Sequence, residues 1–244
     1  MQNSNGEGIE VKIILLGESG VGKTCIINRY INNEYYSDNP STLGSSFTLK
    51  EVIKDKKKYN VNVWDTTGQE KYYSITNLFI HGSDIVILVY AINSKTSFET
   101  LDFWYNSVQE KLGEDGYILA IVGSKSDLTD DEEVSEELAR KFAKEKKAFF
   151  KLVSAKEDPT GINSLFNTVL DILIKSKYLD KRNISTVINK KDQNKKKKKK
   201  SFLLILYFIL VWYLLVEFFI IILKMNFLLI SLICLYMVQI YKKN

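Results

Sequence analysis

A run of small and polar residues near the start of the chain has the spacing of a phosphate-binding loop. Residues 17–24 read GESGVGKT and fit the pattern G-x-x-x-x-G-K-[ST]. Glycines let the backbone wrap so that several N–H groups point at one anion, and a following helix adds the positive end of its dipole. The run stands between a strand-like segment (11–16) and a helix-like segment (25–31). This context favours phosphate binding over an ordinary glycine-rich turn. In such a loop Lys23 can reach the β- and γ-phosphates, and the Thr24 hydroxyl can ligate Mg²⁺.

A second motif, WDTTGQE at residues 64–70, closes another apolar run. Asp65 is placed to hold Mg²⁺ through water, Gly68 lets the backbone approach a γ-phosphate, and Gln69 could orient an attacking water. Alone, the pattern D-x-x-G also fits ordinary turn chemistry. Its distance after the phosphate loop makes the functional interpretation much stronger.

Three further polar segments complete the set. Thr42, in the loop after the first helix-like run, could ligate Mg²⁺. The sequence GSKSD at residues 123–127 ends a strand-like run, and the carboxylate of Asp127 can accept hydrogen bonds from the N1–H and 2-amino group of guanine. Adenine lacks this pair of donors, which disfavours an ATPase. The segment 154–156 (SAK) could offer backbone N–H to the guanine carbonyl, although by itself it also fits a plain strand-to-helix turn.

The elements that must position these segments alternate along residues 9–178. This alternation predicts an α/β fold with a mostly parallel, six-stranded sheet covered on both faces, and ligands at the carboxyl ends of its strands. The short polar stretch 55–58 predicts a hairpin with antiparallel strands. Strands are expected at 11–16, 47–53, 59–64, 85–92, 118–122 and 149–153, and helices at 25–32, 97–112, 132–147 and 161–177.

Charge is distributed unevenly along the 244 residues. Of the net charge of +5, residues 180–200 contribute +8 and residues 201–244 contribute +2, which leaves −5 on residues 1–179. The basic total is therefore no argument for nucleic-acid binding by the folded part. The two cysteines, Cys25 and Cys234, suggest neither a disulfide nor a zinc site.

The motifs GESGVGKT, STLG, WDTTGQE, SKSD and SAK, in this order and spacing, resemble those of Ras-superfamily small GTPases, and most closely the Rab family. YSIT at residues 73–76 and SFETL at 97–101 add to the likeness. The resemblance covers residues 9–178 and implies a P-loop G domain that binds GTP and GDP with Mg²⁺ and hydrolyses GTP slowly. It also implies an exchange factor, a GTPase-activating protein and effectors, recognised through two loops at about 33–46 and 66–80.

The resemblance assigns roles by position. Gln69 would position the attacking water. Mg²⁺ would be held by Thr24 and Thr42 directly, and by Asp65 through water. The nucleotide would be bound by Ser19, Gly20, Val21, Gly22, Lys23, Thr24, Cys25, Thr42, Gly68, Ser124, Lys125, Asp127, Ser154, Ala155 and Lys156.

Two features of this pattern bear on partners and affinity. Phe47, Trp64 and Phe79 fall where Rab proteins carry an aromatic triad between the two loops, so they are expected either to bind partners or simply to pack in the core. Ser124 stands where the family has Asn, and a shorter hydroxyl is expected to weaken the tie between the segment 123–127 and the phosphate loop.

The end of the chain departs from the family, whose members carry terminal cysteines for prenylation. Here residues 1–8 are expected to be a disordered N-terminus, 179–200 a basic linker and 201–244 an apolar membrane anchor. Segment 202–223 is long enough to cross a bilayer, and 227–241 is a marginal second span or an interfacial segment. Membrane attachment would then involve 195–244, on the cytosolic face of an intracellular membrane. Translated non-coding sequence is the remaining interpretation of this tail.

The motifs thus predict a switch that acts in vesicle trafficking. The alternative is an interaction module that binds GTP and scarcely hydrolyses it, which the serine at position 124 keeps open.

Overall fold

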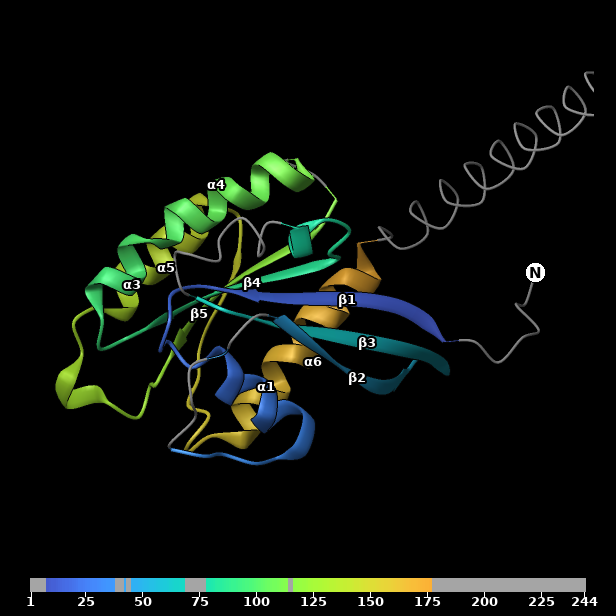
Figure 1. The fold of residues 1–244 in the computed structure, drawn as a ribbon, viewed down its shortest axis with the longest axis horizontal. Coiled ribbons are helices and arrows are strands. Elements are labelled where there is room, and N and C mark those ends of the chain that lie inside the picture. Colours follow the sequence, from blue (N-terminus) through green and yellow to red (C-terminus); the bar gives the residue numbers. More distant parts are fainter. Residues whose placement is uncertain (1–7, 38–41, 43–44, 69–77, 114–115, 177–244) are drawn as a thin grey trace, which may run out of the picture. The chain divides into compact units, whose positions relative to one another are not determined.

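The computed structural model describes residues 8–37, 42, 45–68, 78–113 and 116–176. They all belong to the first of the two compact units into which the chain divides, Met1–Lys181. Six strands form one sheet in the order β2-β3-β1-β4-β5-β6, parallel except for the pair β2 and β3 (Figure 1). The strands are β1 (Ile9–Leu16), β2 (Ser45–Lys54), β3 (Lys57–Thr66), β4 (Ile85–Ala91), β5 (Ile118–Ser124) and β6 (Phe149–Leu152). The α/β class expected from the sequence is confirmed.

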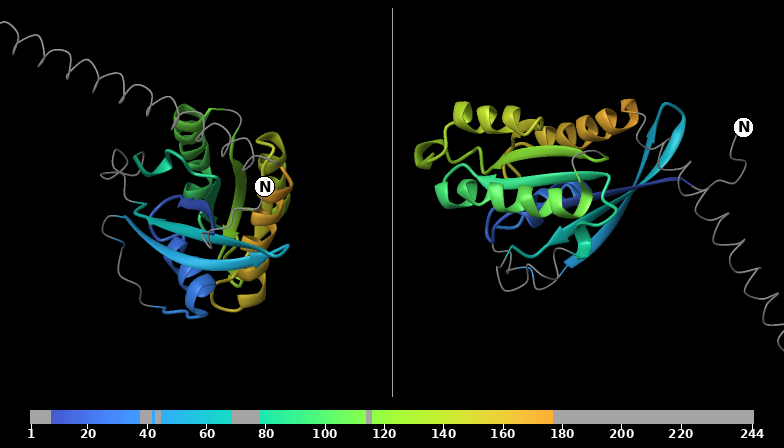
Figure 2. Two further views of the ribbon diagram at one scale, coloured as in Figure 1. Left: turned by 90° about the vertical axis from the view of Figure 1, so that its right-hand side faces the viewer. Right: turned by 90° about the horizontal axis from the view of Figure 1, so that it is seen from above.

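Helices cover both faces of this sheet because its central strands are apolar on both sides. In β1, Val11, Ile13 and Leu15 face one hydrophobic cluster, whereas Ile14 and Leu16 face the other. Helices α1 (Lys23–Asn32) and α6 (Pro159–Lys175) pack on the first face. Helices α3 (Lys95–Glu99), α4 (Leu101–Leu112) and α5 (Glu136–Glu145) pack on the second (Figures 1 and 2).

The predicted hairpin joins β2 and β3. Asp55 and Lys56 both have positive φ, 51° and 59°, which is the backbone conformation of a tight two-residue turn between antiparallel strands. The prediction of antiparallel strands at this point is confirmed.

The segment expected to be one helix over 97–112 is divided into α3 and α4. Local hydroxyls compete with the helical backbone there, because Ser97 Oγ donates to the Ser94 carbonyl and Thr100 Oγ1 donates to the Ser97 carbonyl. The helix expected over 132–147 begins only at Glu136, since the Ser135 hydroxyl caps it by accepting from the Leu138 N–H; a short turn of 3₁₀ helix, η2 (Thr129–Asp131), precedes it. The remaining predicted bounds differ by two residues or fewer.

The part of the chain that the structure describes contains no helix with the length and apolar character needed to cross a bilayer. The predicted N-terminal segment up to residue 7, the basic linker 179–200 and the spans 202–223 and 227–241 all lie outside the described residues. The proposed anchor therefore stays a prediction from the sequence.

Candidate functional site

Loops that follow the carboxyl ends of β1, β3, β5 and β6 line one cavity of about 540 Å³. The cavity brings together Ser19, Gly20, Gly22, Lys23, Thr24, Cys25, Thr42, Gly68, Ser124, Lys125, Asp127, Ala155 and Lys156, all singled out from the sequence. Val21, Asp65 and Ser154 do not line it, but each makes a hydrogen bond with a residue that does. Gln69 lies outside the described residues.

The first turn of α1 is left open to an anion. Gly22 precedes the helix with φ of 91°, a left-handed conformation that suits glycine, and neither a side-chain cap nor an acidic residue occupies that first turn. The N–H groups of this first turn and the helix dipole therefore favour negative charge at this end of the cavity.

Lys23 lies at the same end and is only 5% exposed. Its ammonium donates to the carbonyls of Gly17 (2.8 Å) and Glu18 (2.6 Å). Burial lowers the pKa of Lys23 to about 8, although the charges of Asp65 and Glu18 partly offset this effect. A buried cation whose hydrogen bonds to the described residues go to uncharged carbonyls is well suited to receive a phosphate.

Three oxygen-bearing side chains meet beside Lys23. Thr24 Oγ1 donates to Asp65 Oδ2 over 2.8 Å and lies 2.8 Å from Thr42 Oγ1. Asp65 is 7% exposed, and its Oδ1 has no hydrogen-bond partner among the described residues. Burial raises the pKa of Asp65 against the lowering effect of Thr24 and Lys23. Two hydroxyls and an orphaned carboxylate oxygen form a hard oxygen donor set, which fits Mg²⁺.

Gly68 connects the end of β3 to the phosphate loop through backbone contact. A Cβ atom at Gly68 would lie 2.2 Å from Glu18 C and 2.3 Å from Ser19 N, so no other residue fits without moving one of the two loops. The close approach places this glycine beside the loop that the sequence assigned to phosphate.

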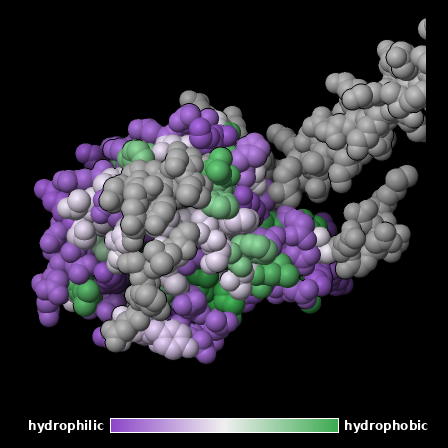
Figure 3. All heavy atoms as spheres, in the orientation of Figure 1, coloured by the Kyte–Doolittle hydropathy of each residue, from purple (hydrophilic) through white to green (hydrophobic). Residues whose placement is uncertain are grey.

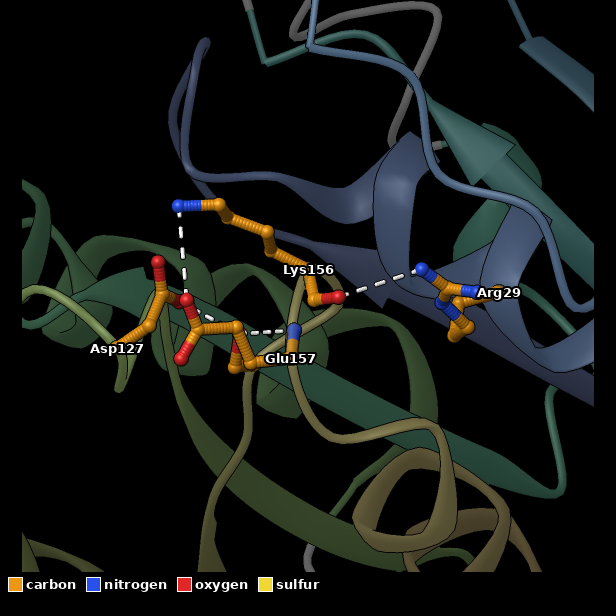
Figure 4. A network of polar contacts seen from close by, with 5 residues as sticks. Arg29, Asp127, Lys156 and Glu157 are labelled. Atoms are coloured by element: carbon orange, nitrogen blue, oxygen red, sulfur yellow. Dashed lines mark hydrogen bonds and ion pairs between the residues drawn. The ribbon is translucent and has the colours of Figure 1, made fainter.

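Polar contacts organise the opposite end of the cavity. Ser154 Oγ donates to Asp127 Oδ1 over 2.6 Å and accepts from the Glu157 N–H over 2.9 Å. Figure 4 shows Asp127 and Lys156 on neighbouring loops of this end, with Lys156 paired to Glu157 at 3.5 Å. The hydroxyl of Ser154 therefore fixes one carboxylate oxygen of Asp127 and leaves the other available to a ligand.

The hydroxyl of Ser124 does reach the phosphate loop, and the weaker tie expected from its short side chain stays a prediction. Ser124 Oγ lies 2.5 Å from the carbonyl oxygen of Val21 and 2.9 Å from that of Tyr90, in a position that is 3% exposed. The tie is formed, but a hydroxyl has one proton and can serve one of the two carbonyls at a time.

Sequence reasoning missed several residues of the cavity. Tyr35 and Ser37 line it from the loop after α1, and Leu128 lines it beside Asp127. None of these three residues belongs to a motif with fixed spacing. The sequence could have indicated them only through their closeness to residues of such motifs. Arg29, on α1, was also missed, although its guanidinium contacts the loop that carries Ala155 and Lys156.

Phe47, Trp64 and Phe79 stack in a row, with ring centroids 5.2 Å and 5.0 Å apart. Trp64 and Phe79 are partly buried against the second hydrophobic cluster, whereas Phe47 is 58% exposed. Hydrophobic area is visible near β2 and β3 on a surface that is otherwise mostly hydrophilic (Figure 3). The row thus combines core packing with an exposed aromatic end.

Comparisons with known proteins agree with this geometry. Residues 12–175 match the model of the Ras family. The chain is 35% identical to the Ras-like GTP-binding protein RYL2 of Yarrowia lipolytica, over 72% of this chain and 84% of the relative. It is 37% identical to the Ras-related protein Rab-11B of Dictyostelium discoideum (68% and 76%) and 36% identical to Rab-7b of Mus musculus (62% and 76%). The chain therefore belongs to the Ras family, in which it is a Rab-like small GTPase.

Proposed function

We propose that the cavity binds GTP and GDP with Mg²⁺, that the chain hydrolyses GTP slowly to GDP and phosphate, and that the two nucleotide states act as a switch. The observation that carries this proposal is the meeting of Lys23 with Thr24, Thr42 and Asp65 at the open end of α1. A buried ammonium supplies charge for phosphate, and the adjoining hydroxyls and carboxylate supply oxygen for the metal.

At the phosphate end, Lys23 and the N–H groups of residues 19–25 would hold the β- and γ-phosphates. Thr24 and Thr42 would ligate Mg²⁺, and Asp65 would hold a water on it. When bound, Mg²⁺ neutralises charge on the phosphates. Gly68 would offer its backbone N–H to the γ-phosphate because it already lies against the phosphate loop. Gln69 would orient the attacking water.

At the base end, Asp127 would accept the N1–H and 2-amino hydrogens of guanine, with one of its oxygens held by Ser154. Lys125 and Tyr35 line the same cavity and would offer apolar surface to a purine. Ala155 and Lys156 would contribute backbone N–H to the guanine carbonyl. The alternative of a binding module without hydrolysis is not favoured, since its one supporting feature, Ser124, keeps contact with the phosphate loop.

The relatives named as Rab proteins support a role in vesicle trafficking on the cytosolic face of an intracellular membrane. Exchange factor, GTPase-activating protein and effectors would contact the loops 33–46 and 66–80 and the exposed side of Phe47, Trp64 and Phe79. Residues 195–244 would hold the chain on the membrane.

Single-turnover hydrolysis and nucleotide selectivity test this function on the full chain in detergent. Magnesium-dependent uptake of GTP is expected, with slow hydrolysis that Gln69→Leu slows further. Asp127→Asn should move preference toward xanthine nucleotides, whereas Asp130→Asn, an exposed acid three residues away, should leave guanine preference intact. Absence of magnesium-dependent GTP uptake would overturn the proposal.

A further inference from the structure

One guanidinium, that of Arg29, holds three carbonyls that belong to two different loops. Arg29 Nε donates to the Ala155 carbonyl over 2.7 Å, and Nη2 donates to the Lys156 carbonyl over 3.4 Å. Nη1 donates to the Asn33 carbonyl at the end of α1 over 2.7 Å. Figure 4 shows the side chain of Arg29 extending from its helix toward Lys156.

The loop at residues 154–156 is called the base loop below. Its two carbonyls that accept hydrogen bonds from Arg29 belong to residues that line the cavity. In a trans peptide the C=O and the following N–H point in opposite directions, and the described residues contain no cis peptide. Holding the Ala155 carbonyl toward α1 therefore fixes the direction of the Lys156 N–H. Arg29 thus sets the orientation of a donor group in the loop that faces the base.

The same side chain joins both ends of the site. It stands on α1, whose first turn carries Lys23 and Thr24, and its third hydrogen bond reaches Asn33, which opens the loop with Tyr35 and Ser37. A planar guanidinium presents its donors in a rigid fork, so its hydrogen bonds are more directional than those of an ammonium. Lysine could keep the charge at this place without reaching all three carbonyls together.

We propose that Arg29 is a positioning residue for guanine recognition, acting through the Ala155–Lys156 backbone without touching the nucleotide itself. This inference rests on the proposed binding of guanine nucleotides. The competing role is mere support of the fold, in which Arg29 closes the last turn of α1 and affects every ligand equally.

The test is GDP dissociation from the full chain in detergent, for wild type, Arg29→Gln, Arg29→Lys and a control, Arg140→Gln, which removes an exposed arginine from an ion pair on α5. Arg29→Gln should release GDP about ten to a hundred times faster than wild type, because charge-assisted hydrogen bonds to the base loop are lost. Arg29→Lys should fall between the two, and Arg140→Gln should match wild type.

A second ligand separates positioning from support. The diphosphate of 2-aminopurine riboside lacks the 6-carbonyl and also the N1–H that Asp127 would accept. The loss at N1 weakens binding to wild type and variant alike, so between these two proteins its affinity should fall by no more than about twofold in Arg29→Gln, while GDP affinity falls tenfold or more. Equal losses for both ligands would overturn the inference. Should Arg29→Gln fail to fold, the lysine variant gives the same comparison. Retention of GDP by wild type with unchanged release from both variants overturns this inference alone, whereas a wild type that cannot retain GDP overturns the proposed function as well.

Discussion

The hydroxyl of Ser124 lies 2.5 Å from the carbonyl oxygen of Val21, across 103 positions in the sequence. This contact joins the last residue of β5 to the phosphate loop, so one buried hydrogen bond connects the two ends of the cavity. Its second acceptor, the Tyr90 carbonyl, lies 2.9 Å away and competes for the same proton.

Removing that hydroxyl should loosen the nucleotide. Ser124→Ala leaves two buried carbonyls without this donor, at a cost of about 1–3 kcal/mol, and GDP release should become about five- to 150-fold faster. Ser124→Asn supplies two amide hydrogens and should slow release relative to wild type. Stopped-flow fluorescence with a labelled GDP measures both rates, and identical rates for all three proteins would contradict the role given to Ser124.

The orphaned oxygen of Asp65 predicts how the protein responds to metal removal. Chelation of Mg²⁺ should speed GDP release from wild type, because the donor set of Thr24 and Asp65 no longer holds the phosphates through the metal. Asp65→Asn should release GDP rapidly with or without Mg²⁺. Asp102→Asn, an exposed acid paired with Lys146, is the matched control and should keep the wild-type response. A full Mg²⁺ response in Asp65→Asn would argue against a metal at this place.

The burial of Lys23 predicts a pH dependence of GDP affinity. In the free protein its pKa is about 8, and a bound phosphate favours the charged form and raises that pKa. Above pH 8 binding must therefore take up a proton, so affinity should fall with rising pH, at most about tenfold per pH unit. Titrations between about pH 7 and 9 measure this, and Lys23→Arg, whose guanidinium stays charged, gives the contribution of all other groups. Constant affinity over that range in wild type would contradict the depressed pKa.

The sequence predicted the fold and most of the cavity for a physical reason. A phosphate loop, an acid that holds a metal and an acid that binds a base each need fixed residue types at fixed positions relative to a strand end. Lys23, Asp65 and Asp127 could therefore be singled out as candidates without coordinates. The alternation of strand-like and helix-like runs predicted a mostly parallel sheet, since parallel strands are buried on both faces by helices.

What could not be predicted depends on contacts between distant segments. Arg29 on α1 has no motif, and only the packing of α1 beside the base loop reveals that its guanidinium meets Ala155 and Lys156. The reach of the Ser124 hydroxyl depends on how closely the phosphate loop approaches β5, and spacing does not encode that distance. Helix bounds moved where hydroxyls of Ser97, Thr100 and Ser135 bonded locally to the backbone.

The aromatic row makes a prediction that separates core packing from a free surface. Trp64 packs against the second hydrophobic cluster and lies between the rings of Phe47 and Phe79. The ammonium of Lys12 lies 4.9 Å from the centre of the Trp64 ring. Trp64→Ala should therefore lower the free energy of unfolding by about 3 kcal/mol or more. Phe47→Ala removes a ring that is 58% exposed and should cost about 1 kcal/mol or less.

Thermal unfolding of the GDP-bound full chain, followed by far-ultraviolet circular dichroism, distinguishes the two variants. Ile53→Ala, also on β2 and 77% exposed, serves as the control for loss of exposed apolar surface and should resemble Phe47→Ala. A loss of stability in Phe47→Ala as large as that in Trp64→Ala would mean that the whole row belongs to the core. A small loss in Phe47→Ala beside a large one in Trp64→Ala leaves Phe47 available to a partner, anchored from beneath by Trp64.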